Sequence, residues 1–202
     1  MNHPQGQWQQ ILARDPGHSA RYIERFRILA AQGHDLYGEA RLVDAMVGRG
    51  AAILDAGCGP GRHAGYLHSA GHRVVGVDVD PALIAAAEVD APGPTYVVAD
   101  LAGYELPADA PQRFDAILCA GNVLAFLHPD TRVPALAGMA ERLAPQGRAV
   151  IGFGAGRGYR FDDFFADAAA AGLVVHARFA TWDLRQFTPE ADFLVAFLGR
   201  GA

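Results

Sequence analysis

Short apolar runs alternate with helix-like segments along the chain from Gly50 onward. Near-continuous apolar character is typical of strands buried on both faces, and it predicts strands over residues 52–56, 73–77, 95–99, 114–119 and 148–153. Proline costs little in a first helical turn, and prolines near their starts favour helices over residues 60–70, 81–89 and 129–143. This alternation predicts an α/β fold in which helices cover both faces of a parallel sheet.

The two ends of the chain differ from this repeating middle. After a predicted helix over residues 162–171, two β-like runs, 173–179 and 192–198, follow one another with no helix between them. Strands joined in that way favour antiparallel pairing. Before Gly50 there is helical periodicity at residues 20–31 and 39–47 and no strand pattern. We therefore expect one domain over residues 1–202, in which residues 1–49 form a helical lid layer and residues 50–202 the core.

Composition narrows the compartment and the partners. Of the 202 residues, 51% are hydrophobic and 19% charged, which excludes a disordered chain, and no apolar run is long enough for a membrane helix. The N-terminal segment lacks a signal-peptide pattern, and the two cysteines, Cys58 and Cys119, have no zinc-site spacing. We expect a cytoplasmic protein without a metal site or membrane contact. A net charge of −5 does not attract phosphate backbones, so nucleic acid is not an expected partner.

A glycine-rich turn follows the first predicted strand. Residues 53–61 read ILDAGCGPG, so that Asp55 ends the strand and Gly57, Gly59 and Gly61 precede a helix. Glycine permits positive φ and lets a ligand approach the backbone, and the helix start offers free amides to a polar group. A dinucleotide loop, G-x-G-x-x-G, would need glycine where this chain has Arg62. The segment therefore predicts a ligand loop of another kind.

Acidic residues also end the next two predicted strands. Asp78 lies 21 residues after Gly57, close to the offset of an acid that binds ribose hydroxyls. Asp80 stands before Pro81 and is expected to cap a helix. Asp100 ends the third strand. The carboxyl ends of parallel strands meet at one sheet edge, so these acids predict a ligand crevice there.

Together, ILDAGCGPG, GVDVDP at residues 76–81 and VADL at residues 98–101 resemble the signature of class I S-adenosylmethionine-dependent methyltransferases, in the family's order and spacing. The resemblance implies a Rossmann-like fold with a mostly parallel seven-stranded sheet and an antiparallel C-terminal hairpin. It also implies that S-adenosylmethionine is the cofactor. The residues it assigns to the cofactor are Asp55, Gly57, Cys58, Gly59, Asp78, Val79, Asp100, Leu101, Ala120, Gly121 and Asn122.

The same resemblance distributes roles among these residues. The glycine loop lines the methionine portion, and Asp55 holds either the loop or the cofactor's ammonium group. Asp78 takes the ribose hydroxyls. Val79, Asp100 and Leu101 surround adenine, and residues 120–122 face the methyl group.

The acceptor is less clearly marked. Methyltransferases of planar amino groups carry Asp or Asn, two prolines and an aromatic where this chain reads Asn-Val-Leu-Ala at residues 122–125, so such an acceptor is disfavoured. A small molecule is the expected acceptor. Asn122 has two open roles, orienting the substrate through its amide or capping a turn. The other candidates for the substrate pocket are Tyr22, Tyr159 and Trp182.

Other side chains offer weaker signals. His63 and His128 are near the expected crevice, but no general base is evident, and methyl transfer from a sulfonium can depend mainly on alignment. Candidates to meet the cofactor carboxylate through a forked donor are Arg21, Arg27 and Arg41.

Two alternatives to a methyltransferase remain open at this point. A protein that binds S-adenosylmethionine without catalysis would keep Asp55, Asp78 and the glycines. A nicotinamide-dependent oxidoreductase is disfavoured by Arg62 and by the lack of any lysine for a Tyr-x-x-x-Lys motif.

Overall fold

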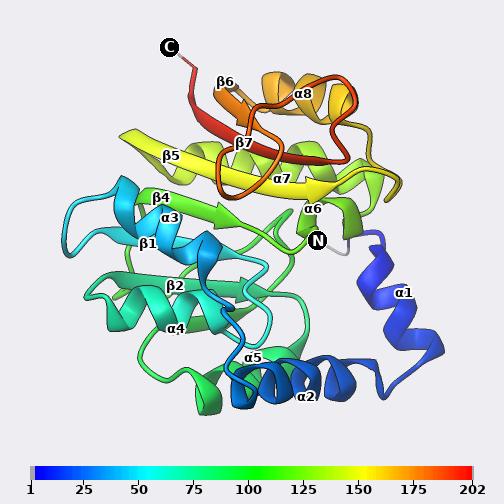
Figure 1. Cartoon of the computed structure of the whole chain (residues 1–202), viewed down its shortest axis with the longest axis vertical. Helices are drawn as coiled ribbons and strands as arrows, with labels where there is room; N and C mark the ends of the chain where they lie inside the picture. The colour runs from blue at the N-terminus through cyan, green and yellow to red at the C-terminus, as the bar shows by residue number, and fades with distance from the viewer. Residues whose placement is uncertain (1–2, 202) are drawn as a thin grey trace.

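One seven-stranded sheet organises residues 3–201, which the computed structural model describes (Figure 1). The strand order is β3-β2-β1-β4-β5-β7-β6. The strands are β1 (Ala52–Ala56), β2 (Arg73–Asp78), β3 (Thr95–Val98), β4 (Phe114–Cys119), β5 (Leu143–Gly154), β6 (Leu173–Phe179) and β7 (Phe193–Arg200).

Five strands are parallel and the C-terminal end is antiparallel. β1 pairs in parallel with β2 and β4, β2 with β3, and β4 with β5. β7 runs antiparallel to both of its neighbours, β5 and β6. The predicted antiparallel hairpin is confirmed, and β7 lies between β5 and β6, an order that the strand pattern alone does not give.

Eight helices are formed within the described residues. They are α1 (Gln7–Arg14), α2 (His18–Ala31), α3 (Gly38–Met46), α4 (Arg62–Ser69), α5 (Pro81–Asp90), α6 (Val123–Phe126), α7 (Pro129–Arg142) and α8 (Phe161–Ala170). None of them has the length and apolar character needed to cross a bilayer. Two of these helices were not predicted from the sequence: α1, which has no buried residue, and α6, which is a single turn.

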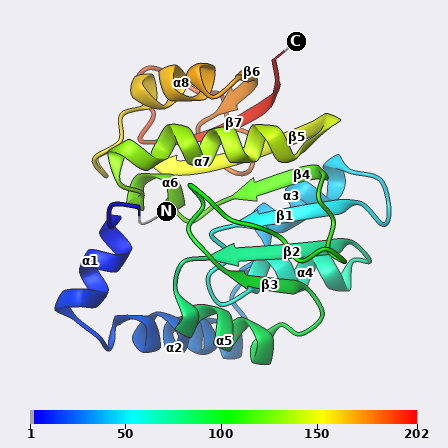
Figure 2. The same cartoon turned by 180° about the vertical axis from the view of Figure 1, so that it is seen from behind.

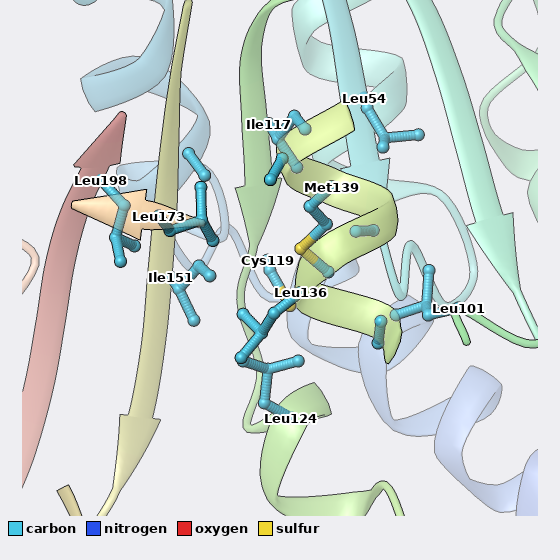
Figure 3. Close-up of a cluster of buried hydrophobic side chains, with 14 of the residues drawn as sticks. Leu54, Leu101, Ile117, Cys119, Leu124, Leu136, Met139, Ile151, Leu173 and Leu198 are labelled. Carbon is cyan, nitrogen blue, oxygen red and sulfur yellow. The ribbon is translucent and has the colours of Figure 1, made fainter. Parts of the chain in front are cut away.

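Helices cover both faces of the sheet, as predicted. α3 and α4 lie on the face seen in Figure 1, and α7 and α8 lie on the face seen in Figure 2. Because side chains alternate across a strand, successive residues join different cores. Ile53 packs on the side of α3 and α4, whereas Leu54 packs on the side of α7. Figure 3 shows the second core, where Leu136 and Met139 of α7 face the sheet.

Helices α1 and α2 lie apart from these two cores, whereas α3, which the predicted lid layer includes, packs into one of them through Ala40 and Val43. α1 lies beyond the carboxyl ends of the strands, and α2 runs beside α5 (Figures 1 and 2). A small third cluster joins Ile23 of α2 to Leu83 and Ala86 of α5. Trp8 and Tyr22 pack on that cluster, so α1 and α2 close over the sheet edge where the glycine-rich turn lies.

Candidate functional site

A cavity of about 570 Å³ lies between the carboxyl ends of the strands and helices α1 and α2. Volumes of this order are typical of small-molecule sites. It is lined by ten of the eleven residues that the resemblance assigned to the cofactor, namely Gly57, Cys58, Gly59, Asp78, Val79, Asp100, Leu101, Ala120, Gly121 and Asn122. The tertiary structure thus brings together four segments that are separated in the sequence.

The glycine-rich turn meets its neighbours closely. Gly57 has φ +80°, and a Cβ there would lie 2.3 Å from Val123 Cγ2. Its amide donates to Val77 O at 2.8 Å, which ties the turn to β2. Only glycine satisfies this conformation and this contact together. The turn is therefore held against both α6 and the neighbouring strand.

Asp78 receives two backbone hydrogen bonds at the end of β2. One carboxylate oxygen accepts the Gly59 amide at 2.9 Å and the other accepts the Asp80 amide at 3.0 Å. Burial raises the pKa of Asp78 to about 6, although these two amides oppose the shift. Each oxygen retains a lone pair, so the carboxylate can accept two further hydroxyl donors.

Asp100 borders the same end of the cavity. Its Oδ1 accepts the Ala102 amide at 2.9 Å, which leaves Oδ2 available to a ligand. The apolar side chains of Val79 and Leu101 line the wall beside it. This part of the cavity combines two carboxylates with apolar surface, a donor set that suits the hydroxyls and base of a nucleoside.

Asp55 is the assigned residue that does not line the cavity. It is 1% exposed, and its Oδ2 has no hydrogen-bond partner among residues 3–201. Burial raises the pKa of Asp55, against the pull of His63 and Arg62. Of its two predicted roles, holding the loop fits this position under the turn better than contact with a ligand. Cys58 is also buried, and burial raises the pKa of its thiol well above its usual range, so the thiol stays protonated.

A charged cluster supports the start of α4 behind the turn. Arg62 donates to Glu39 at 3.2 Å and to the carbonyl oxygen of Leu36, and His63 Nε2 lies 3.5 Å from Glu39. Burial alone would raise the pKa of Glu39, but His63 and Arg62 overcome it and hold the pKa below its usual range. His63 therefore packs beside Glu39 behind the turn, although it also lines the cavity.

Asn122 holds the β4–α6 turn in place. It adopts φ +68°, a left-handed conformation that asparagine tolerates better than most residues. Its Oδ1 accepts the Gly154 amide at 2.8 Å, which ties the turn to the end of β5, and it does not cap its own helix. The structure thus adds a third role, a tether to β5, and leaves the amide nitrogen of this cavity-lining residue without a hydrogen-bond partner in residues 3–201.

Two of the residues predicted for the substrate pocket lie elsewhere. Tyr159 is 2% exposed, stacks on Phe153 and donates its hydroxyl to Asp167 at 2.7 Å. Trp182 packs over Gly152 in the α3 and α4 core. Their aromatic character reflects core packing, and neither lines the cavity. Tyr22 does line it.

The three arginines that were predicted to bind the cofactor's carboxylate form surface ion pairs instead. Arg21 pairs with Asp15, Arg27 with Asp90 and Arg41 with Asp35, and none of the three lines this cavity.

Arg25 lines the cavity instead, without an ion-pair partner in the described chain. Arg25 was not predicted for this site, although its position in the sequence offers a signal. Arg25 lies three residues after Tyr22, a spacing that places both on one helix face.

Helices α1 and α2 are attached to the rest of the protein at Asp80, next to Asp78. Trp8 Nε1 donates to Asp80 Oδ2 at 2.9 Å, and Ser19 Oγ donates to the same oxygen. Asp80 Oδ1 accepts the Ala82 amide, which confirms the predicted helix cap. Since the Asp80 amide in turn donates to Asp78, helices α1 and α2 are connected to the cavity wall through one residue.

Comparison with known proteins agrees with this geometry. A family model described as a methyltransferase domain matches residues 53–147. The chain is 50% identical to a TehB-like SAM-dependent methyltransferase from Corynebacterium glutamicum, with 92% of this chain and 100% of that one covered and a TM-score of 0.85.

More distant similarities cover less or show the fold alone. A malonyl-[acyl-carrier protein] O-methyltransferase of Pseudescherichia vulneris is 38% identical over 43% of this chain, which spans 36% of that protein's length. The 1,6-didemethyltoxoflavin-N1-methyltransferase of Burkholderia thailandensis shares the fold at 22% identity and a TM-score of 0.62, with 100% and 94% of the two chains covered. From the full-length match and the cavity together, the chain belongs to the class I S-adenosylmethionine-dependent methyltransferases.

Proposed function

We propose that this methyltransferase acts on a small molecule, which binds in the same cavity as the cofactor. The observation that supports this proposal is one cavity of about 570 Å³ that extends from Asp78 and Asp100 to α6, the start of α7 and the loop after β5. Helices α1 and α2 border it on the outer side. A cavity enclosed in this way suits a compact acceptor better than a macromolecule.

The residues at one end fit S-adenosylmethionine. Asp78 has free lone pairs for two ribose hydroxyls, Asp100 has a free oxygen for the adenine amino group, and Val79 and Leu101 offer apolar contact to the ring. Residues 57–59 line the methionine portion in this assignment, and Arg25 is available for its carboxylate. When bound, the cofactor supplies an activated methyl group on a sulfonium.

The protein's own contribution is alignment and exclusion of water. A backbone hydrogen bond holds the turn at Gly57, and the side-chain Oδ1 of Asn122 holds the second turn by accepting the Gly154 amide, so the floor between the two ends of the cavity is fixed. Tyr22 remains a neutral phenol, because burial raises its pKa. Correct placement of an acceptor that is already nucleophilic can provide most of the rate enhancement.

Calorimetry and turnover test this function. S-adenosylhomocysteine should bind the purified protein and raise its melting temperature, whereas NAD should do neither. Release of S-adenosylhomocysteine from S-adenosylmethionine should then be stimulated by members of a panel of small thiols, amines and hydroxyl compounds, and not by unfolded peptide or RNA. Stimulation by peptide or RNA alone would contradict a small-molecule acceptor.

A further inference from the structure

The cavity has a second end, away from the strand-end acids. We call it the acceptor end and define it by the polar side chains of Gln9, Asn122, His128, Thr131 and Arg157, all of which line the cavity. The sheet order separates the two ends, because Asp78 ends β2 and Asp100 follows β3, whereas Asn122 and Arg157 follow β4 and β5. The inference below rests on the proposed function, in which this end receives the methyl acceptor.

Two amide side chains at the acceptor end have their oxygen atoms already engaged. Gln9 Oε1 accepts the Gly6 amide at 2.8 Å, and Asn122 Oδ1 accepts the Gly154 amide at 2.8 Å. A backbone amide is a donor, so the atom that it meets in each side chain must be the oxygen. Each residue is left with its NH₂ group, and both offer hydrogen-bond donors to a ligand.

His128 also accepts a backbone amide and keeps a donor for a ligand. Its Nδ1 accepts the Asp130 amide at 3.3 Å at the start of α7. The Asp130 carboxylate lies farther from Nδ1, at 3.6 Å. In the tautomer that accepts the amide, the hydrogen is on Nε2, which makes Nε2 a donor. Thr131 is the exception among the five, because its hydroxyl donates to His128 O at 2.9 Å and retains only lone pairs.

Arg157 adds a positive charge to these donors. Its guanidinium has no hydrogen bond or carboxylate partner anywhere in residues 3–201. It lies between Gly156 and Gly158, whose φ angles of +73° and +78° side chains rarely adopt.

The loop that carries Arg157 is fixed at both ends. The Ala155 amide donates to Asp192 O at 2.7 Å, and Arg132 Nη2 donates to Gly158 O at 3.0 Å. Arg132 is itself buried and lies over the Tyr159 ring at 4.0 Å. The core therefore holds this loop at the mouth of the acceptor end, while Arg157 projects from it unpaired.

From this arrangement we propose that the acceptor end recognises an anionic oxygen group, a carboxylate or another oxyanion, on the methyl acceptor. Three fixed N–H donors and one unpaired guanidinium line this end, and none of its five defining side chains is a carboxylate. The Asp130 carboxylate lies 3.6 Å from His128 Nδ1 but does not line the cavity. A cationic acceptor would therefore meet no carboxylate in the lining of this end, whereas an oxyanion can accept from several donors at once and from the guanidinium fork in bidentate fashion.

Nuclear magnetic resonance of the side-chain amides provides a direct test. Protein labelled with ¹⁵N and saturated with S-adenosylhomocysteine is titrated with benzoate, with benzamide as the neutral analogue, and with sulfate as an inorganic oxyanion. Benzoate or sulfate should shift the Gln9 and Asn122 NH₂ signals saturably, and benzamide should not. Arg157→Gln should lower the affinity for the anion at least roughly tenfold, since it removes a charge-assisted contact.

Arg160→Gln is the matched control, because it removes the same charge from a residue three positions along the chain. The Arg160 side chain is 79% exposed and does not line the cavity. It should leave the titration unchanged. A response to benzoate alone assigns the site to organic carboxylates, and a response to sulfate extends it to inorganic oxyanions. Equal binding of benzamide, no anion response, or unchanged affinity in Arg157→Gln would each overturn the proposal. A protein that fails to bind S-adenosylhomocysteine contradicts the proposed function instead, and the titration is then run without it.

Discussion

The floor and the outer wall of the cavity are built in different ways. The floor consists of turns that end β1, β2 and β4, and backbone hydrogen bonds such as Gly57 N to Val77 O fix it to the sheet. The outer wall consists of α1 and α2, where α1 has no buried residue and α2 has only Ser19 and Ile23. Side-chain donors from Trp8 and Ser19 to Asp80 attach this wall. Regions with few buried contacts open at lower free-energy cost than the core. The floor should therefore define the cofactor site, and the wall should open and close it.

Gly57→Ala is expected to have the largest effect, a loss of folding stability, because residue 57 packs closely against Val123 in the floor. A new methyl group must displace Val123, 2.3 Å from its Cγ2, in a conformation unfavourable to alanine. Strain and overpacking together should cost about 2–6 kcal/mol of stability. Thermal and urea unfolding measure this cost. Gly50→Ala is the control, with φ +71° and no atom within 4 Å of its new Cβ, and should cost only the conformational part. Equal losses in the two variants would show that contact with Val123 is unimportant.

Asp78→Ala should come next, with an effect on ligand affinity more than on folding. Two ribose hydroxyls would lose a charged acceptor, and the Gly59 and Asp80 amides would lose theirs. S-adenosylhomocysteine should bind roughly 10- to 100-fold more weakly in calorimetry. Parental affinity in this variant would place the ribose elsewhere.

The pH dependence of binding should follow from the same carboxyl. Its pKa of about 6 means that it is mostly ionised at neutral pH and becomes protonated as the pH falls through 6. If the ionised form accepts the hydroxyls, affinity should drop by roughly tenfold for each pH unit below 6. Calorimetry between pH 5 and 8 measures this slope, and Asp78→Asn should flatten it. A wild-type affinity that is constant over this range would contradict the assignment.

The contribution of Asp78 to the stability of the free protein should depend on pH in the opposite direction to its contribution to ligand affinity. The folded pKa of Asp78 lies above the ordinary value of 3.8, so the folded state binds this proton more tightly than the unfolded state. Its contribution to stability is present at low pH and is lost as the pH rises through about 6. The Asp78→Asn variant isolates this contribution by comparison with wild type.

The outer wall should give the smallest effect on affinity and the clearest effect on dynamics. The double variant Trp8→Phe with Ser19→Ala removes both donors to Asp80 and should speed hydrogen exchange across residues 7–31. In the wild-type protein, S-adenosylhomocysteine should slow exchange in this segment, as a lid requires. Equally slow exchange with and without ligand would make the helices a permanent layer.

Much of the floor could be predicted because local rules govern it. The strand Phe114–Cys119, which leads into one of the floor turns, follows from an apolar run, and the glycine turn follows from a short motif. The outer wall was harder to predict. α1 is amphipathic, but it spans only eight residues, carries three glutamines in QWQQILAR and buries none of its residues, so the apolar pattern of the chain does not mark it. Tyr159 and Trp182 were predicted to line a pocket because an aromatic residue in a core and one in a cavity look the same in the sequence.

The sequence by itself determined the family signature, the sheet's parallel and antiparallel parts, and the acids at the ends of three strands, because strand periodicity and turn chemistry are local properties. Only the tertiary structure decided which side chains face the cavity and which of their atoms are free. Asn122 and Gln9 become fixed donors because distant or neighbouring backbone amides occupy their oxygens, and Arg157 stays unpaired while Arg21, Arg27 and Arg41 do not. These outcomes depend on which groups folding places within hydrogen-bond distance, and spacing along the chain does not fix that.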